Sequence, residues 1–454
     1  MFSSNSFIQR LHRISPVRTL LLFYFIAVIF STTLLLLPVA YQEGVQISLI
    51  DTIFTAVSAL SVTGLSTVTI ADTFSTVGII FIAIILQLGA VGVMAIGTLI
   101  WLLLGRKIGL KERRLIMTDQ NQTAFSGMVS LIKEITLVLL SIELISFIVL
   151  GTYYLQYFPT VEEAFLNGFF GTISAVSNGG FDITGQSLIP YKDDYFIQFI
   201  TMSLIILGAI GFPVLIEVKS FLLKEHIGHR KRRFTLFTKL TTTTFLILIV
   251  FGALFIYLLD MNHYFADKSW HASLFYSLFQ SVTTRSGGLS TMDVSQLTES
   301  NHLFMSFLMF IGASPSSAGG GIRTTTFALV VIFIITYARG GKSIRIFKRE
   351  VHEEDLLKAV TVTLMAIGLV FISSVIITII EPYTVTEIFF DVTSAFGTVG
   401  LSLGITSKLT TFSKIILMLL MFIGRIGIIT FLFTFKSNKN VGNYHYPKER
   451  IIIG

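Results

Sequence analysis

The sequence predicts an all-α polytopic membrane protein in which four similar units surround a central pore. Three observations support this fold class. Hydrophobic residues make up 53% of the 454 residues, and charged residues only 13%. Several apolar runs exceed the roughly 18 residues that suggest a membrane-spanning helix, and residues 76–104 contain no charged side chain. A short phrase rich in Ser and Gly also recurs four times along the chain.

The recurring phrase contains one glycine that aligns in all four copies. The copies occupy residues 58–66, 174–181, 282–290 and 394–402. The aligned glycines are Gly64, Gly180, Gly288 and Gly400, which lie 116, 108 and 112 residues apart. A period of this kind is typical of a repeat architecture. It predicts four copies of one unit around one axis, each contributing a short non-helical segment to the centre.

Basic residues collect in five clusters, which hold 23 of the 33 Lys and Arg residues. The clusters lie at residues 10–18, 106–114, 219–233, 339–349 and 436–450. The positive-inside rule assigns all five to the cytoplasmic side, so an even number of crossings separates neighbouring clusters. This distribution accounts for the net charge of +7 without a nucleic-acid partner, and we predict no nucleic-acid binding.

Two long apolar segments and one shorter segment lie between neighbouring basic clusters. The long segments are 19–38, 76–104, 134–157, 195–223, 236–259, 302–337, 356–380 and 412–435. The shorter ones, which lead into the recurring phrase, are 51–62, 163–178, 271–286 and 387–398. Interpreting them as re-entrant half-helices preserves the charge pattern, because irregular backbone is tolerated at membrane depth where it lines a cavity or is buried in protein. We therefore predict eight crossings, with both termini cytoplasmic.

These segments divide the chain into four repeats of the form helix, pore helix, loop, helix. The predicted repeats are 1–110, 111–233, 234–349 with a gating loop, and 350–454 with a C-terminal tail. Cysteine is absent, which excludes disulfides and thiolate metal sites.

The four loops predict a filter for cations. Glycine near the tip of a loop lets the backbone turn its carbonyl oxygens toward an axis, since positive φ and close packing become cheap. Four such loops form a ring of oxygens that replaces the water shell of a cation such as K+, and the half-helices aim their negative C-terminal ends at the same point. The predicted ion-binding residues are Val62, Thr63, Gly64, Asn178, Gly179, Gly180, Ser286, Gly287, Gly288, Thr398, Val399 and Gly400.

Only the fourth copy, Thr398-Val399-Gly400, matches the start of the potassium-channel filter phrase. Each copy has one aligned glycine followed by Leu or Phe, where the channel phrase continues with Tyr and Gly. This difference indicates fewer ion sites than a potassium channel has. The alternative interpretation is that the phrases are small-residue contacts between membrane helices.

A ten-residue segment interrupts the expected helix 302–337. It reads Gly312, Ala313, Ser314, Pro315, Ser316, Ser317, Ala318, Gly319, Gly320 and Gly321. One Gly or Pro costs a helix interior about 1–3 kcal/mol, so four Gly and one Pro cannot form a continuous helix. Because we expect such a break only in the third repeat, we interpret it as a flexible plug below the filter. A static kink is the alternative.

Arg425 lies inside the last apolar segment, where a charge is costly and is a functional candidate by default. We interpret it as an electrostatic barrier below the filter that pairs with the plug. The alternative is an ion pair with Glu143, or a side chain that snorkels to the interface. Arg323 is expected at the interface and Arg285 behind the third loop. Glu143 is interpreted as a buried structural carboxylate, with proton coupling as the alternative.

The four repeats with single filter glycines resemble the superfamily of Ktr, Trk and HKT cation transporters, and within it the KtrB-type ion-translocating subunit of bacterial Ktr systems. The resemblance covers nearly the whole chain. It implies potassium uptake, often favoured by sodium, and a gating loop at 312–321. It also implies a homodimer with one pore in each subunit, docked on an octameric cytoplasmic ring of nucleotide-binding RCK subunits of the KtrA or KtrC type. Nucleotide binding then belongs to the partner and not to this chain.

Two other classes of function compete with this interpretation. An enzyme needs a catalytic constellation such as His-Glu-x-x-His, Gly-x-Ser-x-Gly or paired Asp within the crossing helices. None of these lies there, so we predict no enzyme. An alternating-access cation symporter often has helices broken at corresponding positions. With only one broken helix expected, a gated pore is preferred, and a less selective Na+/K+ pore stays open. The basic residues Lys224, Arg230, Arg232 and Arg345 offer a docking surface to an acidic ring.

Overall fold

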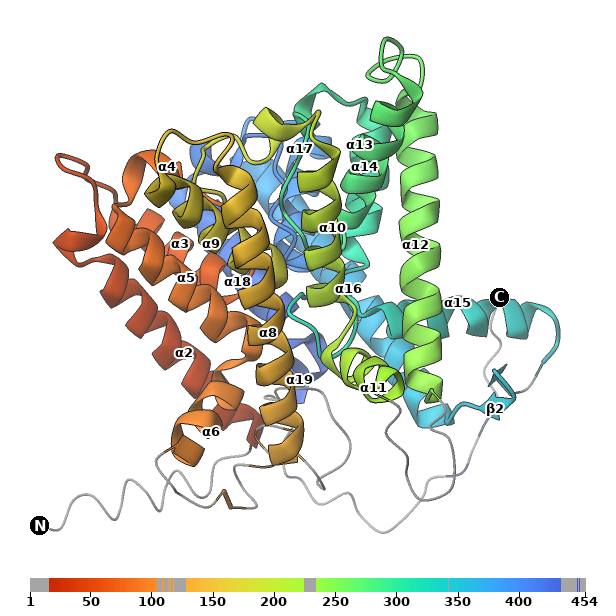
Figure 1. The fold of residues 1–454 in the computed structure, drawn as a ribbon. Coiled ribbons are helices and arrows are strands. Elements are labelled where there is room, and N and C mark those ends of the chain that lie inside the picture. The colour runs from red at the N-terminus through yellow and green to blue at the C-terminus, as the bar shows by residue number, and fades with distance from the viewer. Residues whose placement is uncertain are drawn as a thin grey trace, which may run out of the picture.

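The computed structural model is a bundle of helices in which α11 and α15 lie across the main direction of the bundle (Figure 1). One two-stranded β-hairpin is the only sheet in the part of the chain that the structure describes. The described residues are 16–103, 108–109, 113, 115, 117, 128–223, 234–341, 343–433, 447 and 449.

Each predicted repeat begins with a long apolar helix. The four are α2 (Pro16–Leu35), α8 (Met128–Tyr154), α12 (Leu236–Asp260) and α16 (Glu353–Ile380). Among the described helices, these are the ones long and apolar enough to cross a membrane singly. Their outer sides expose large apolar side chains such as Leu140, Val250 and Phe371, a surface that suits contact with lipid.

A short helix follows each long one, and each short helix begins at a Ser or Thr. These helices are α3 (Leu49–Leu60), α9 (Val161–Val176), α13 (Trp270–Thr283) and α17 (Val385–Gly397). The side chain before each accepts a hydrogen bond from the backbone N–H three residues later, which satisfies a donor that the helix itself cannot. Before α17, Thr384 and Glu387 form a complete capping box. The four helices closely match the short segments predicted from the sequence.

The second long segment of every repeat is broken, so the prediction of continuous helices at 76–104, 195–223 and 412–435 is wrong. The chain bends by 97° between α5 (Thr76–Val91) and α6 (Val93–Leu103), and by 106° between α10 (Tyr195–Ala209) and α11 (Phe212–Leu222). The other two pairs are α14 (Glu299–Phe310) with α15 (Thr324–Ala338), and α18 (Thr411–Ile426) with α19 (Ile428–Phe433).

Glycine with a positive φ stands at three of these breaks. Gly92, Gly211 and Gly427 have φ values of 96°, 102° and 93°, with ψ values of 136°, 129° and 139°. Other residues rarely adopt this conformation, so glycine allows an abrupt turn within an apolar run. The expectation that only the third repeat is interrupted is therefore wrong. Repeat 3 differs in having a longer insertion between its two helices.

The number of membrane crossings stays a prediction. By length and composition, the described residues contain four spans, or six if each of the two sharply bent pairs counts as one. The four helices α14, α15, α18 and α19 are each shorter than the roughly 20 residues of a full span.

The helix that follows the loop in each repeat packs against the short helix of the next repeat. These contacts pair α5 with α9, α10 with α13, α14 with α17, and α18 with α3. The last pair joins the end of the chain to its beginning. The four units therefore form a closed ring with approximate fourfold symmetry.

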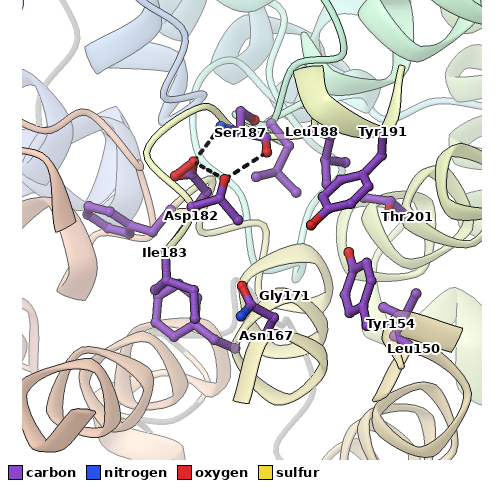
Figure 2. Close-up of a pocket in the computed structure, with 14 residues that line it drawn as sticks. Leu150, Tyr154, Asn167, Gly171, Asp182, Ile183, Ser187, Leu188, Tyr191 and Thr201 are labelled. Carbon is purple, nitrogen blue, oxygen red and sulfur yellow. Dashed lines mark hydrogen bonds between the residues drawn. The ribbon is translucent and has the colours of Figure 1, made fainter. Parts of the chain in front are cut away.

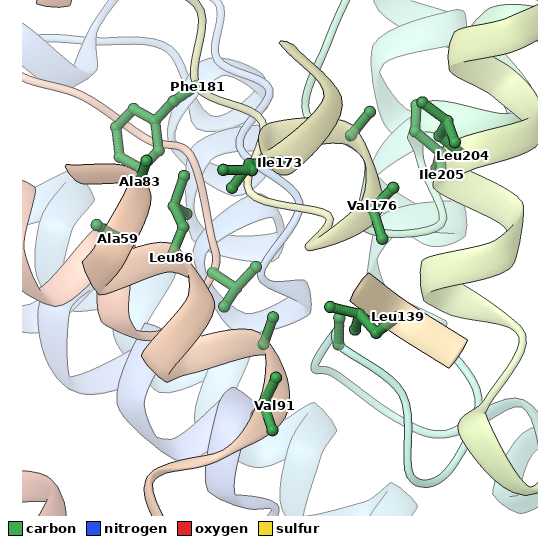
Figure 3. Packing of buried hydrophobic residues seen from close by; sticks show 14 of the residues in the cluster. Ala59, Ala83, Leu86, Val91, Leu139, Ile173, Val176, Phe181, Leu204 and Ile205 are labelled. Carbon is green, nitrogen blue, oxygen red and sulfur yellow. The ribbon is translucent and has the colours of Figure 1, made fainter. Parts of the chain in front are cut away.

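A large hydrophobic cluster includes the seam between repeats 1 and 2 (Figure 3) and extends into repeats 3 and 4. Ile173 and Val176 of α9 lie in it together with Leu86 of α5 and Ile205 of α10. Each such side chain contributes about 1.5–3 kcal/mol on burial from water. Within a bilayer, where these side chains are not transferred from water, close van der Waals packing stabilises the contact between the helices instead.

The β-hairpin connects repeats 3 and 4. Its strands are β1 (Arg345–Ile346) and β2 (Arg349–Glu350), and positive φ at Phe347 and Lys348 gives a tight turn. Arg345, one of the four basic residues predicted to dock a partner, is exposed on this hairpin. The other three, Lys224, Arg230 and Arg232, lie outside the described residues.

An ion pair joins repeat 4 to repeat 1. Lys414 Nζ at the start of α18 lies 2.8 Å from Asp51 Oδ1 in the first turn of α3. The two side chains are 9% and 19% exposed. Ser48 Oγ also donates to Asp51 at 2.6 Å, and a carboxylate suits the positive end of a helix.

We expect Lys414→Met to destabilise the ring. The cost should be about 1–3 kcal/mol, below the ~3–5 kcal/mol of a fully buried pair, because both side chains retain some contact with water. Thermal unfolding in detergent measures this change. The charge-reversed pair Asp51→Lys with Lys414→Asp should recover part of the loss. An unchanged melting temperature in Lys414→Met would show that the ion pair does not help to close the ring.

Candidate ion pathway

The loop after each short helix is anchored by the recurring phrase. In repeat 1, Ser58 O accepts a hydrogen bond from Thr63 N at 2.8 Å, and Ser58 Oγ accepts one from Gly64 N at 3.1 Å. Ser394 makes the same two bonds in repeat 4, at 2.9 Å and 3.1 Å. The serine of the phrase thus folds the loop back onto the end of its own helix.

Repeats 2 and 3 use variants of this anchor. Ser174 O accepts from Gly179 N at 2.7 Å, while Ser174 Oγ donates to Phe181 O at 2.6 Å. In repeat 3, Thr283 O accepts from Gly287 N at 2.7 Å. The symmetry of the four loops is therefore approximate.

The backbone has an unusual and repeated conformation at the tip of every loop. Positive φ, between 49° and 85°, occurs at the non-glycine residues Val62, Asn178, Ser286 and Thr398. Two residues later φ is positive again, between 66° and 97°, at the four aligned glycines. Positive φ outside glycine is uncommon and indicates a constraint. Its recurrence at one position of all four loops shows that they share a constrained geometry.

The four aligned glycines meet at the centre of the ring. A methyl group added to Gly64 would lie 2.5 Å from the carbonyl oxygen of Gly179 and 2.9 Å from the Cα of Gly180. One on Gly180 would lie 2.8 Å from the Cα of Gly288, and one on Gly288 would lie 3.5 Å from that of Gly400. One on Gly400 would lie 3.1 Å from the Cα of Gly64, which completes the circle.

The residue before each aligned glycine places its carbonyl oxygen against the neighbouring loop. These oxygens belong to Thr63, Gly179, Gly287 and Val399. Each loop continues from the C-terminal, electronegative end of its short helix. A ring of carbonyl oxygens in this setting can replace the water around a dehydrated cation. The structure thus brings the predicted ion-binding residues of all four repeats together.

The segment 312–321 lies against the ring. A methyl group on Gly319 would be 2.7 Å from Ser286 Cβ, and one on Gly320 would be 2.7 Å from Thr398 Oγ1. These two neighbours belong to the third and fourth loops and are themselves joined by a bond from Ser286 Oγ to Thr398 O at 2.6 Å. The segment therefore lies against the third and fourth loops of the ring.

Arg425 joins this segment to repeat 1 and is only 8% exposed. Its guanidinium group donates exclusively to main-chain carbonyl oxygens in the bonds that the structure gives it. Nη1 donates to Ser317, Ala318 and Gly319, and Nη2 to Gly89 and Ala90. The contact partners lie in the interrupting segment and at the end of α5.

Arg323 lies at the same segment, although the sequence predicts it at the membrane interface. Its Nη1 donates to the carbonyl oxygens of Ser314, at 3.4 Å, and Gly319. Both arginines thus contact the segment.

Two further ionisable side chains are buried. Glu143 accepts a hydrogen bond from Gln87 Nε2 at 2.5 Å, which joins α8 to α5. Arg285 is fully buried, and its Nη2 donates to Leu308 O in α14, behind the third loop.

A small pocket lies beside the loop that follows Gly180 (Figure 2). Its Asp182 accepts hydrogen bonds from the backbone N–H of Gly185, at 3.1 Å, and of Ser187. Burial raises the pKa of the Asp182 carboxyl group above its usual value, against the opposing effect of these donors. Ser290 N donates to Ser187 Oγ at 2.9 Å, so the pocket lies where the second and third loops join.

Residues 400–404 read Gly-Leu-Ser-Leu-Gly, a pattern that in hydrolases presents a nucleophilic serine on a strand-to-helix turn. Here the serine follows a loop instead of a strand. Ser402 Oγ donates to Asp391 at 3.1 Å and accepts from Gly404 N at 3.0 Å. Its role is to anchor the fourth loop to α17.

Comparison with known proteins decides the family. A family model described as a cation transport protein, TrkH, matches residues 17–444. The chain belongs to the TrkH family. This confirms the resemblance stated from the sequence. It makes the chain a multi-pass membrane protein of a family described as cation transport proteins.

Individual relatives match this TrkH-family chain over almost its full length. It is 56% identical to the Ktr system potassium uptake protein D of Bacillus subtilis, over 97% of this chain and 98% of that protein. It is 35% identical to the Ktr system potassium uptake protein B of the same organism, over 97% of each. The crystal structure of the potassium transporter TrkH from Vibrio parahaemolyticus shares the fold, with a TM-score of 0.69 at 20% identity over 91% of this chain and 84% of that chain.

Substitution of the aligned glycines should impair cation selection. We expect Gly→Ser at Gly64, Gly180, Gly288 or Gly400 to lower the preference for K+ over Na+ about tenfold, the effect of ~1.4 kcal/mol, because the new side chain enters the oxygen ring. Ion uptake by purified protein in vesicles measures this preference. Gly97→Ser in α6 is the control, since a methyl group there meets nothing within 4 Å. Equal, mild effects at all five positions would contradict the prediction.

Proposed function

We propose that the chain takes up potassium across the cell membrane as the ion-translocating subunit of a Ktr-type system. The carbonyl oxygens around the four aligned glycines act as the selectivity filter, and K+ is the transported ion. The convergence of these glycines carries the proposal, because it leaves oxygens and no side chains between the loops. Two relatives named as Ktr system potassium uptake proteins support potassium as the ion.

In this proposal the segment 312–321 is the gate. An ion that leaves the ring past Ser286 and Thr398 meets Gly319 and Gly320. Arg425 adds an electrostatic barrier. At an effective dielectric constant near 20, two unit charges about 4 Å apart repel by ~4 kcal/mol.

The assembly follows from the same family. We propose a homodimer with one pore in each subunit, docked on a cytoplasmic RCK-type ring that binds the regulatory nucleotide. The Ktr system names of the relatives support a multi-subunit system. A relative at 30% identity, the potassium/sodium uptake protein NtpJ of Enterococcus hirae, supports a role for sodium, which we propose to be stimulation.

A less selective Na+/K+ pore is the second candidate. The side chains that follow the aligned glycines are all buried and contribute to the core: Leu65, Phe181, Leu289 and Leu401. This favours a filter with fewer oxygen layers than a potassium channel has. An alternating-access symporter also stays a candidate. All four repeats have a broken helix, whereas the preference for a pore assumed that only one helix is broken. Ion turnover per second separates a pore from a symporter.

Growth of a potassium-uptake-deficient bacterium tests the main proposal. The chain should restore growth at low external K+, and a cognate RCK subunit should strengthen the rescue. Added Na+ should stimulate uptake of K+ without competing with it, whereas a less selective pore would show competition. Failure to rescue growth when both subunits are present at the membrane would overturn the proposal.

Arg425→Gln should raise cation flux per molecule. The change removes a positive charge near the path and weakens the hold on the gate, and even ~1.4 kcal/mol corresponds to a tenfold rate. Arg425→Lys should raise flux less, because it keeps the charge while a single ammonium group cannot span both sets of carbonyls. Flux and protein abundance are measured together. Lower abundance with unchanged flux per molecule would assign Arg425 to the scaffold instead of the gate.

A further inference from the structure

We infer that the broken helix of repeat 2 positions the segment 312–321, and that Gly211 is a positioning residue for it. This inference rests on the proposed gating function of the segment. It assigns to the α10–α11 corner a role in holding the gate closed.

The end of α10 supplies hydrogen-bond acceptors to the segment. A helix that stops at a bend leaves its last carbonyl groups without partners inside the helix. Those of Gly208 and Ala209 accept bonds from Ala318 N at 3.2 Å and Ser314 N at 3.0 Å. The N–H groups of the segment thus pair with the carbonyl groups that the bend leaves free at the end of α10.

The start of α11 supplies a donor to the same segment. The first N–H groups of a helix also lack internal partners. Phe212 N, at the first position of α11, donates to Ser316 O at 2.8 Å. The α10–α11 corner therefore bonds three residues of the segment through the backbone. Repeat 4 adds one similar bond, from Gly321 N to Gly424 O at 3.2 Å.

Gly211 lies at the point where the corner and the segment touch. A methyl group on it would lie 2.8 Å from the carbonyl oxygen of Pro315, near the middle of the segment. Its counterpart at the break of repeat 4, Gly427, has nearly the same φ and ψ, yet a methyl group there would meet nothing within 4 Å. The two glycines carry the same backbone strain, but only Gly211 has the segment against it.

The helix α11 runs from this corner to Lys219 in its last turn. The predicted docking cluster 219–233 begins within α11, at Lys219, and α11 lies across the bundle (Figure 1). A displacement of α11 moves Phe212 and with it the bond to Ser316. Contact with a partner at this end can therefore be transmitted to the gate through one short helix.

Two matched substitutions test the inference in purified protein without a partner subunit. In Gly211→Ala the new methyl group displaces Pro315 and destabilises the closed position, so flux per molecule should rise about fivefold or more, within the usual range of coupling between sites. Gly427→Ala has the same strain without the contact, and its flux should stay near that of the parent. Equal changes in both variants would overturn the inference.

A variant with a shortened segment 312–321 shows whether Gly211→Ala acts by displacing this segment or by a general effect on the structure. If the segment is the gate, the shortened protein should transport faster than the parent, and Gly211→Ala should add nothing further. An equal effect of Gly211→Ala in both backgrounds would refute the positioning role. If the shortened protein folds but transports no faster than the parent, the gating proposal itself fails.

Phe212 offers a second pair if Gly211→Ala does not fold. Proline is tolerated at the first position of a helix and lacks the N–H that bonds Ser316. Phe212→Ala loses the same aromatic ring but keeps that N–H. Flux should be several-fold higher in Phe212→Pro than in Phe212→Ala, and equal flux in the two would count against the inference.

Discussion

Four glycines that contact one another around one axis determine the arrangement of the rest of the molecule. Since no side chain fits between their loops, the loops approach to backbone distance, and the four short helices that carry them must converge. The helix that follows each loop, such as α5 or α10, then packs against the short helix of the next unit. The ring of oxygens is a consequence of the same constraint, because excluding side chains from the centre leaves only main-chain atoms there.

The need of buried backbone groups for hydrogen-bond partners links the helix breaks to the interrupting segment. Each unsatisfied backbone group costs several kcal/mol in a bilayer, so a ten-residue non-helical segment must find partners in neighbouring protein. It finds them at helix ends, where bends expose carbonyls at Gly208, Ala209 and Gly424. Each irregular element therefore satisfies the other, and neither would be stable in the apolar interior alone.

Local signals made the four short helices and their loops predictable from the sequence. The Ser or Thr before each helix and the serine of the recurring phrase act on backbone within a few residues, so they are visible in one stretch of chain. The sequence does not predict the helix breaks at Gly92 and its counterparts, because glycine is common in apolar runs. Hydropathy also does not show whether an apolar run continues straight or bends. The contact of Arg425 with Gly89 connects opposite ends of the chain, which no local pattern encodes.

The hydrogen-bond partners of Arg425 and Arg323 link two properties that we propose for these residues, holding the segment 312–321 and repelling a cation. The bonds that the structure gives Arg425 and Arg323 end on carbonyl oxygens, which satisfy the donors but carry no formal charge. A carboxylate would hold the guanidinium groups equally well and would cancel their field. With carbonyls as acceptors, the positive charge of the two guanidinium groups is not cancelled, and Arg425 is also held by Gly89 and Ala90 at the end of α5. In the proposed mechanism, moving the segment therefore removes the physical obstruction and breaks the bonds between the segment and both arginines in one step, while Arg425 keeps its bonds to the end of α5.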